Sequence, residues 1–392
     1  MLFNTALIAL SATLASANNL WIADYGGLVT TAALTEKGGS YSLTKKSTTD
    51  HCGPAPSWLT IDTNRGLMFC LNEGLLEGDA LPNGSISSFT INGDASLEPV
   101  KNGTSILGPV SGLIYGNPTG QRGLVAAHYL GSAVTTWLLN GHGAFEHSQD
   151  LTYTGKGPLP EQDAPHPHEA IMDPTGQYIL APDLGLDVVH IYTYDKTSLK
   201  LTEIDSLKVS PGTGPRHAVF WNPSGVACDT CTTFMFLVGE LAGDVTSFAV
   251  SYGEAGKGMT FKNVTSAITQ PDNERNAPAE LQITPDGRFL IVSNRDNTEK
   301  IPDSTRSSLT TYPLREDGTF GEPQLTKSDL IGSGYPRHFS LNKYGNLVAV
   351  GLQYGKQTVI LQRNTSSGEI LSEAVAKLPA NGQVTNVMWD EW

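Results

Sequence analysis

The chain repeats one sequence pattern about every fifty residues, and this repeat constrains the fold more than any other feature. Each copy has an apolar stretch, a turn whose typical form is Asp/Asn-Pro-x-Gly, a second apolar stretch and then a polar residue. The turns begin at Asp62, Asn117, Asp173, Asn222, Thr284 and Asn342. A unit repeated at this period must stack on its neighbours to bury its apolar faces, and units of this size fit four-stranded propeller blades.

The two ends of the chain together supply a seventh unit. Residues 20–25 (LWIADY) have the pattern of a second strand without a first, and residues 385–390 (TNVMWD) have the pattern of a first strand without a second. Pairing them would complete a blade and leave no open sheet edge. We therefore expect an all-β fold: a single seven-bladed β-propeller domain over residues 18–392, closed by its N- and C-terminal strands.

Residues 1–17 are typical of a secretory signal peptide. Residues 6–14 are mostly apolar, and Ala15-Ser16-Ala17 forms a small-x-small cleavage site. No other stretch is long and apolar enough to cross a membrane. The sequence therefore predicts a secreted, extracellular protein.

Glycosylation sequons agree with secretion. Four Asn-x-Ser/Thr triplets lie in polar, turn-like segments, at Asn83, Asn102, Asn263 and Asn364.

The cysteines also favour an oxidising compartment. There are four of them, Cys52, Cys70, Cys228 and Cys231, which allow three pairings. We favour Cys228–Cys231, because both lie in one short insertion, and this leaves Cys52–Cys70. A zinc or redox role for Cys228 and Cys231 is the alternative, but no second ligand pair completes a tetrahedral site.

The charge of the chain limits the classes of partner that it is expected to bind. The formal net charge is -14, and no run of Lys and Arg is long enough to follow a phosphate backbone. We therefore expect neither nucleic acid nor an anionic membrane as a partner. A monomer is the default expectation.

The copies of the repeat differ most at two places, the start of the first strand and the end of the second. In a propeller both places face one mouth of the central channel. The aligned residues are Ser57, Gly112, His168, Arg216, Ala279 and Arg337 at the first place, and Glu73, His128-Tyr129, Asp183, Glu240, Asn294-Arg295 and Gln353 at the second. A repeat kept only for folding would repeat these residues, so their change to His, Arg and Glu indicates a site.

Four segments carry a resemblance to a known family. They are residues 165–170 (PHPHEA), 214–220 (GPRHAVF), 277–295 and 335–340 (YPRHFS). In order and spacing they resemble the lactonase-type seven-bladed propellers, which include bacterial 6-phosphogluconolactonases and fungal carboxy-cis,cis-muconate lactonizing cyclases. The resemblance extends through nearly the whole chain after residue 17.

The resemblance to the cyclases implies four catalytic residues: His168, Arg216, Glu240 and Arg295. This chain departs from the cyclase pattern by an insertion with two cysteines before Glu240 and by an extra residue after Arg216. It also has Arg337, and an arginine at this place resembles the phosphogluconolactonase branch of the family instead. These departures leave the substrate open. We expect further substrate-binding or rim-shaping residues at Arg337, Glu73, His128 and Asp183. His217 and Glu280 are expected to be structural partners between blades.

The residue types suit lactone chemistry. A lactone opens through a tetrahedral oxyanion, which arginines stabilise by charge and paired donors. His168, with an ordinary pKa of about 6.5, suits proton transfer, and Glu240 could orient it or an arginine. In the reverse, lactonizing reaction a carboxylate adds to a double bond and the histidine protonates the resulting enolate. Neither reaction needs a metal or another cofactor.

Two functions remain as expectations. The first is an enzyme that hydrolyses a lactone, or forms one from an unsaturated or hydroxy acid, and that acts on a small anionic or lactone substrate outside the cell. The second is a non-catalytic propeller that binds a small acid or a protein at its channel mouth. A single histidine or arginine near these turns can have a structural role, but four together in family positions favour the enzyme.

Overall fold

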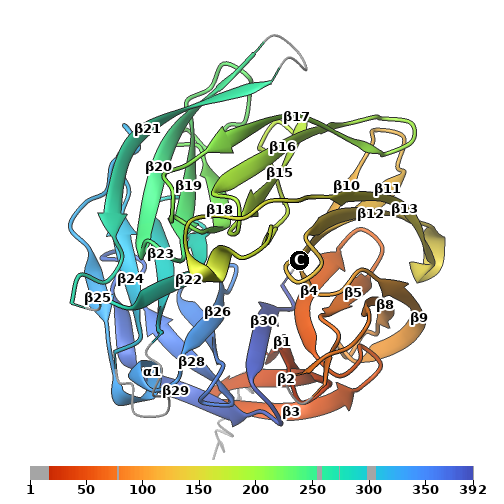
Figure 1. Ribbon diagram of the computed structural model, residues 1–392. Coiled ribbons are helices and arrows are strands. Elements are labelled where there is room, and N and C mark those ends of the chain that lie inside the picture. The colour runs from red at the N-terminus through yellow and green to blue at the C-terminus, as the bar shows by residue number, and fades with distance from the viewer. Residues whose placement is uncertain (1–16, 77–78, 254–257, 273, 298–305, 392) are drawn as a thin grey trace, which may run out of the picture.

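The computed structural model describes residues 17–76, 79–253, 258–272, 274–297 and 306–391. These residues form seven four-stranded antiparallel sheets around one axis (Figure 1), so the chain is an all-β, seven-bladed propeller as predicted. We number the blades in chain order. The strands of each blade are given from the axis outward. Blade 1 consists of β4 (Pro56–Asp62), β5 (Leu67–Asn72), β8 (Gly84–Ile91) and β9 (Leu97–Ser105), and blade 2 of β10 (Pro109–Gly116), β11 (Arg122–His128), β12 (Ala133–Leu139) and β13 (Phe145–Thr152). Blade 3 consists of β14 (Ile171–Met172), β15 (Tyr178–Asp183), β16 (Val188–Tyr194) and β17 (Leu201–Lys208).

The remaining blades follow the same order. Blade 4 consists of β18 (Pro215–Trp221), β19 (Thr233–Gly239), β20 (Asp244–Tyr252) and β21 (Met259–Ile268), and blade 5 of β22 (Asn276–Ile283), β23 (Phe289–Asp296), β24 (Ser308–Pro313) and β25 (Gln324–Thr326). Blade 6 consists of β26 (Pro336–Leu341), β27 (Leu347–Leu352), β28 (Gln357–Arg363) and β29 (Ile370–Pro379), and blade 7 of β30 (Val384–Trp389), β1 (Ala17–Asp24), β2 (Leu28–Lys37) and β3 (Ser40–Thr49). Short elements lie in the connections: the hairpin of β6 (Leu75–Leu76) and β7 (Asp79–Ala80), the 3-10 turns Gly141–Gly143 and Pro160–Gln162, and the helix α1 (Asp329–Gly332).

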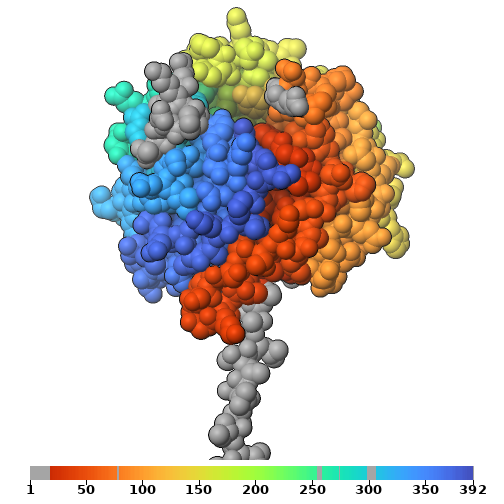
Figure 2. Space-filling view, turned by 90° about the horizontal axis from the view of Figure 1, so that it is seen from below, coloured from red at the N-terminus to blue at the C-terminus, as the bar shows by residue number. Residues whose placement is uncertain are grey.

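Blade 7 closes the ring as the sequence predicted. β1 pairs with β30, with Ile22 opposite Val387, and the Thr385 hydroxyl donates to the carbonyl of Ala23 at 3.1 Å. In Figure 2 the red N-terminal and blue C-terminal segments lie against each other on the surface. The pairing removes the two sheet edges that separate termini would leave open.

In blades 1 to 6 the repeated turns join the first and second strands, at the end of the blade opposite the site described below. In blade 3 the amide of Gly176 donates to the carbonyl of Asp173 at 3.0 Å, and Gly176 has a φ of 69°. A residue without Cβ adopts this left-handed conformation at least cost, which explains why the turn ends in glycine. The carboxylate of Asp173 also accepts from the amide of Tyr178 at 2.6 Å, which fixes the start of β15.

The core lies between neighbouring blades. The second strands are buried on both faces: all residues of β5, β15, β19 and β27 are buried. In one cluster Val125 and Val134 of blade 2 pack with Ile179 and Ala181 of blade 3. Burial on both faces explains why these strands are continuous apolar runs rather than alternating ones.

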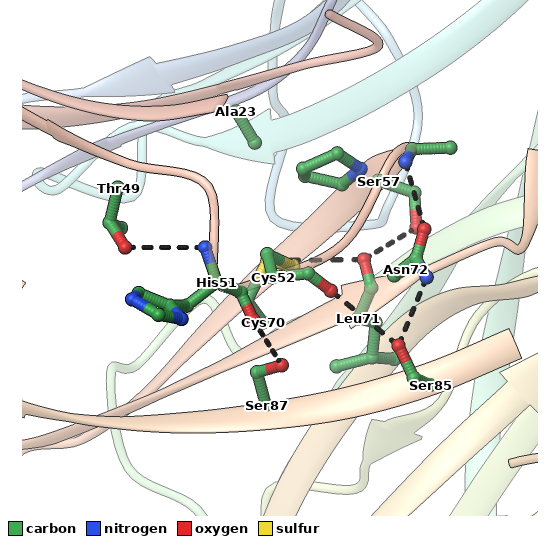
Figure 3. Close-up of a disulfide and its surroundings, with 12 residues drawn as sticks. Ala23, Thr49, His51, Cys52, Ser57, Cys70, Leu71, Asn72, Ser85 and Ser87 are labelled. Carbon is green, nitrogen blue, oxygen red and sulfur yellow. Dashed lines mark hydrogen bonds between the residues drawn. A yellow bond between two sulfur atoms is a disulfide. The ribbon is translucent and has the colours of Figure 1, made fainter. Parts of the chain in front are cut away.

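Both predicted disulfides are present. Cys52, in the connection after β3, is bonded to Cys70 in β5, and Cys228 is bonded to Cys231 in the hairpin between β18 and β19. Figure 3 shows the first disulfide in its surroundings: the hydroxyl of Ser87 donates to the carbonyl of His51 at 2.8 Å beside it. The connection from blade 7 is thus fastened to blade 1.

Other predictions fall at the surface or outside the described part. The proposed signal peptide lies outside the described residues, except for Ala17, which begins β1. Among the described residues, no helix is long and apolar enough to cross a membrane. The four sequon asparagines, Asn83, Asn102, Asn263 and Asn364, are exposed.

Candidate active site at the channel mouth

A β-bulge recurs near the start of the first strands. In blade 6, Pro336 pairs with Leu352 and His338 with Gly351, which leaves Arg337 unpaired between them. In blade 4 the irregularity holds two residues, Arg216 and His217. A bulge redirects side chains, and the first strand is a sheet edge, where proline is tolerated.

The bulged residues form what we call the proline-bulge ring. In blades 1 to 6 each member directly follows a proline, and in blade 7 it follows Val384. The members, in blade order, are Ser57, Val110, His168, Arg216, Ala279, Arg337 and Thr385. Gly112, which the sequence alignment placed here, pairs with Ala126 further along β10, and Val110 takes its place.

A second ring lies beside the first. In each blade the proline before the bulge, or Val384 in blade 7, pairs with a residue at the end of the second strand. The residue that directly follows this partner belongs to the second ring, which we call the strand-end ring. Its members, in blade order, are Glu73, Tyr129, Leu184, Glu240, Arg295, Gln353 and Tyr25. In every blade except blade 5, the backbone amide of the strand-end residue donates a hydrogen bond to the first-strand side of the blade. The acceptor is the carbonyl of the residue just before the proline, or before Val384 in blade 7; for example, the amide of Glu240 donates to the carbonyl of Gly214 at 2.8 Å. The backbone therefore holds both rings at the same mouth of the channel.

A small cavity lies inside the proline-bulge ring. It is lined by Ser57, Trp58, Val110, His168, Arg216, His217, Arg337, His338 and Thr385. Its volume of about 10 Å³ is about the space that one water molecule needs. Three of the predicted site residues, His168, Arg216 and Arg337, thus line one cavity.

Glu240 binds two of the predicted arginines. Its Oε2 lies 2.8 Å from Nε of Arg216 and 2.7 Å from Nη2 of Arg295. Arg216 also donates to the carbonyl of Ala279 at 2.8 Å, and Arg295 to that of Ala277 at 3.1 Å. Burial opposes ionisation of Glu240, but the charges of Arg295 and Arg216 outweigh it and lower the pKa of the carboxyl group.

Arg337 belongs to a second charged group of the site, together with Tyr25 and Glu73. Its Nη1 donates to the hydroxyl of Tyr25 at 2.7 Å, and its Nη2 lies 3.2 Å from Oε1 of Glu73. Tyr25 in turn hydrogen-bonds to Glu73. Burial and the neighbouring carboxylate raise the pKa of the Tyr25 hydroxyl, so it stays protonated and fixes both charged groups.

His168 lies between these two groups. Its side chain is buried, and its Nδ1 has no hydrogen-bond partner among the described residues. The ring contacts Tyr129 edge-on, with centroids 5.5 Å apart, and His217 at 5.1 Å. Burial, and after it the charge of Arg216, hold the pKa of His168 well below its ordinary value, so the imidazole is neutral. A neutral, unpartnered imidazole can accept a proton.

Of the four predicted substrate-binding residues, only Arg337 lines this cavity; Glu73 contacts Arg337, whereas His128 and Asp183 make other contacts. Nε2 of His128 lies 2.9 Å from the Thr135 hydroxyl, within blade 2. Asp183 accepts from the amides of Gly185 at 2.9 Å and Leu186 at 3.0 Å, and so holds a loop. Both are the strand partners of the prolines, one position before the strand-end ring. One position along a strand turns a side chain to the other face.

His217 and Glu280 connect neighbouring blades, as the sequence suggested. Nδ1 of His217 lies 3.3 Å from Oε2 of Glu280, and Nε2 of His338 lies 3.2 Å from the same oxygen. The three residues come from β18, β22 and β26. They lie directly under the proline-bulge ring.

Three tyrosines of the site were not predicted as site residues. Tyr25 contacts Arg337, Tyr129 contacts His168, and Tyr335 has its ring centroid 5.4 Å from the Arg295 guanidinium. Tyr335 has a φ of 60°, a strained backbone for a bulky residue of the kind found at functional sites. The signal for Tyr25 and Tyr129 was their place directly after a second strand, equivalent to Glu73.

The donors of the site can be compared with those of a metal site. Within the described ranges, no three His, Cys, Asp or Glu side chains converge in a way that could hold a metal ion. The site consists of arginines paired with Glu240 and Glu73, tyrosines and a neutral histidine. Such groups bind negative charge and transfer protons.

The seven four-stranded blades around one axis define the class of protein, a seven-bladed β-propeller. The family described as "Lactonase, 7-bladed beta-propeller" matches residues 19–388, and the chain belongs to it. A probable 6-phosphogluconolactonase from Arthroderma benhamiae is 29% identical over 384 residues, which cover 97% of this chain and 91% of that protein. A 6-phosphogluconolactonase from Formosa agariphila is 25% identical over 331 residues, covering 83% of this chain and 86% of that protein.

Solved structures agree on the fold. A putative 6-phosphogluconolactonase from Bacteroides fragilis has a TM-score of 0.76 and 21% identity, covering 96% of this chain and 98% of its own. A periplasmic gluconolactonase from Pseudomonas aeruginosa has a TM-score of 0.76 and 22% identity, covering 95% and 99%. At this identity the likeness is one of fold.

Proposed function

We propose that this protein is a lactonase that hydrolyses a small lactone at the arginine-lined channel mouth. The observation that carries the proposal is the convergence of Arg216, Arg295 and Arg337 around one buried, neutral histidine, His168. With Glu240 and Glu73 counted, three positive and two negative charges leave one positive charge in excess. That charge suits an oxyanion or a carboxylate.

The proposed reaction uses each group once. His168 accepts a proton from water while the water oxygen forms a bond to the lactone carbonyl carbon. Arg216 and Arg295 stabilise the negative charge that develops on the carbonyl oxygen. The ring C–O bond then breaks, and the proton on His168 passes to the departing alkoxide. The new carboxylic acid ionises, so each turnover releases one proton.

The state of His168 supports hydrolysis over cyclisation. Hydrolysis begins with a histidine that accepts a proton, whereas protonation of an enolate needs a histidine that already carries one. Burial and Arg216 keep the pKa of His168 low, which favours the accepting form. Cyclisation of an unsaturated acid is therefore the second candidate.

The substrate class follows from the relatives and from the predicted secretion. Relatives over most of the chain are named 6-phosphogluconolactonase, which makes a sugar-acid lactone the first candidate. An extracellular protein would meet unphosphorylated lactones more often than phosphorylated metabolites. The exposed sequon asparagines and the two disulfides support secretion.

The test is turnover of a panel of aldonolactones, phosphorylated and not, and of muconates by the purified protein. His168→Ala and Arg216→Ala should each lower kcat/KM about a hundredfold or more. Arg288→Ala is the matched control, because Arg288 is exposed and pairs with Asp286 on a turn. If nothing on the panel turns over, or if both site variants match the wild type, the protein is not a lactonase. Binding of a small acid without turnover would then favour a non-catalytic propeller.

A further inference from the structure

The central channel contains a second group of titratable residues that the proposed reaction does not use. Glu169, His217, Glu280 and His338 are all buried and lie beneath the proline-bulge ring. Trp58 packs edge-on against His217 and His338, with ring centroids 5.7 and 5.3 Å away. We call these four titratable residues the channel column.

The channel column begins at the site. His168 and His217 have ring centroids 5.1 Å apart, and both line the small cavity that has room for about one water molecule. His217 then reaches two carboxylates: its Nδ1 lies 3.3 Å from Glu280 and 3.9 Å from Glu169. These contacts connect the site to the carboxylates through one imidazole.

The hydrogen bonds fix one end of the channel column. The backbone amide of Val387 donates to Nδ1 of His338 at 3.3 Å, so a neutral His338 carries its proton on Nε2. That nitrogen lies 3.2 Å from Oε2 of Glu280. Oε1 of Glu280 accepts from the amide of Leu281 at 2.9 Å. Oε2 of Glu280 is thus shared by two imidazoles from two other blades.

The channel column ends at a larger space. A cavity of about 490 Å³, which we call the lower channel cavity, is lined by residues further along the same first strands, toward the repeated turns. Trp58, Glu169, Glu280 and His338 are among its lining residues. Water can therefore approach the carboxylates from the mouth opposite the arginines.

The charge along the channel changes from positive at the upper mouth to negative below it. Three arginines surround the upper mouth, and two carboxylates lie below. Burial, and after it the charge of Glu280, raise the pKa of Glu169 well above its ordinary value, which lets the carboxylates hold a proton. A proton on His168 is repelled by the arginines and attracted by the carboxylates. The charged or titratable groups that face His168 and His217 are Arg216, Arg295, Arg337, Glu240, Glu169, Glu280 and His338.

We propose that His217 and Glu280 form a proton relay between His168 and water in the lower channel cavity. The inference rests on the proposed function, because hydrolysis of a lactone releases one proton per turnover. That proton passes from the site through His168 to His217, from His217 to Glu280, and from Glu280 to water below. No bond other than those to the proton forms or breaks. Glu280 touches no substrate and is a positioning residue.

The test compares Glu280→Gln with Glu280→Asp in the full chain, using a turned-over lactone. Glutamine keeps the shape and the contact with Leu281 but cannot carry the proton. We expect Glu280→Gln to lower kcat about tenfold or more with KM unchanged, aspartate to restore part of the loss, and added imidazole to restore it further. Ser340→Ala is the matched control, because Ser340 lines the lower channel cavity and its hydroxyl has no hydrogen-bond partner among the described residues.

Two results would overturn the relay. One is an unchanged kcat for Glu280→Gln. The other is a Glu280→Gln variant with a lower kcat that imidazole does not restore and with a lower melting temperature. That result would mean that Glu280 has a structural role. If Glu280→Gln does not fold, Glu169→Gln takes its place with the same expectations, because Glu169 also faces His217.

A second readout separates the relay from the proposed function. The ¹⁵N chemical shifts of the histidine rings can be titrated without any substrate. If the wild type turns over no lactone, the proposed function fails, and these shifts decide the relay alone. A changed titration of His168 in Glu280→Gln supports the coupling through His217, and an identical titration in both proteins overturns it.

Discussion

The carboxylate of Glu240 lies 2.7 Å from the guanidinium of Arg295, and the two residues come from neighbouring blades, 4 and 5. The same carboxylate binds Arg216 at 2.8 Å. Both arginines are therefore held at the channel mouth by one acceptor. This arrangement links the charge of the site to the stability of the ring.

The first prediction concerns acid stability. The pKa of Glu240 is lowered in the folded protein, so its ion pairs stabilise the fold above the ordinary carboxyl range and lose this effect as pH falls through the lowered pKa. Glu240→Gln should lower the free energy of unfolding at neutral pH by about 2 kcal/mol or more, with a smaller difference below about pH 4. Denaturant unfolding at several pH values measures this. A difference that grows toward acid would contradict it.

The second prediction concerns the pH dependence of activity. Because the pKa of His168 is held well below 6.5, the accepting form is already present at neutral pH. In the proposed hydrolysis kcat/KM should therefore stay level from about pH 8 to about pH 6.5 and fall only in more acid solution. A pH–rate profile checks this. An acid limb centred at or above the ordinary histidine pKa would show that His168 is not the base.

The third prediction concerns closure of the ring. Truncation after Gly382 removes β30, the first strand of blade 7, and with it the partner of β1. We expect the truncated chain to lose the sharp thermal transition of the full chain, because β30 carries contacts of blade 7 with blades 1 and 6 and these are lost with it. Truncation after Asp390 leaves β30 intact and is the control. A sharp native transition in the shorter chain would mean that the terminal pairing does not close the fold.

The fourth prediction compares the two disulfides. The Cys52–Cys70 bond spans 18 positions and both its cysteines are buried, whereas Cys228–Cys231 spans three in an insertion of blade 4. Replacing Cys52 and Cys70 by alanine should cost about 3 kcal/mol, and the other pair about 2 kcal/mol, because the longer loop loses more entropy when closed. Calorimetry on both double variants measures the order. Equal losses would contradict it.

The fifth prediction concerns secretion. Expressed with its own N-terminus in a secreting eukaryotic host, the protein should appear in the medium without residues 1–17 and with N-linked glycans. Enzymatic removal of the glycans should lower its mass, and replacing Asn83, Asn102, Asn263 and Asn364 by glutamine should remove the shift. Retention of the protein inside the cell with an intact N-terminus would overturn the signal-peptide hypothesis.

The alignment of the repeats and the strand pairing differ by one position in blade 3, and in blade 2 the alignment left two residues, His128 and Tyr129, together. Glu73 and Glu240 each follow the strand partner of a proline, whereas His128 and Asp183 are themselves such partners. Tyr129 and Leu184, one residue later, take the equivalent places. Apolar runs buried on both faces do not mark which residue faces the channel, so the register had to come from pairing.

The sequence by itself determined the number of blades, the closure by the two ends and the residue types at the mouth, and it favoured the disulfide pairing that the structure has. It could do so because turns with glycine and runs of apolar residues are local signals that repeat with the structure. Only the tertiary structure decided that Arg216 and Arg295 share the carboxylate of Glu240, that Tyr25 contacts Arg337, and that His217 lies beside both His168 and Glu280. These contacts join residues of different blades, and their geometry depends on the bulge after each proline and on how neighbouring blades pack around the axis.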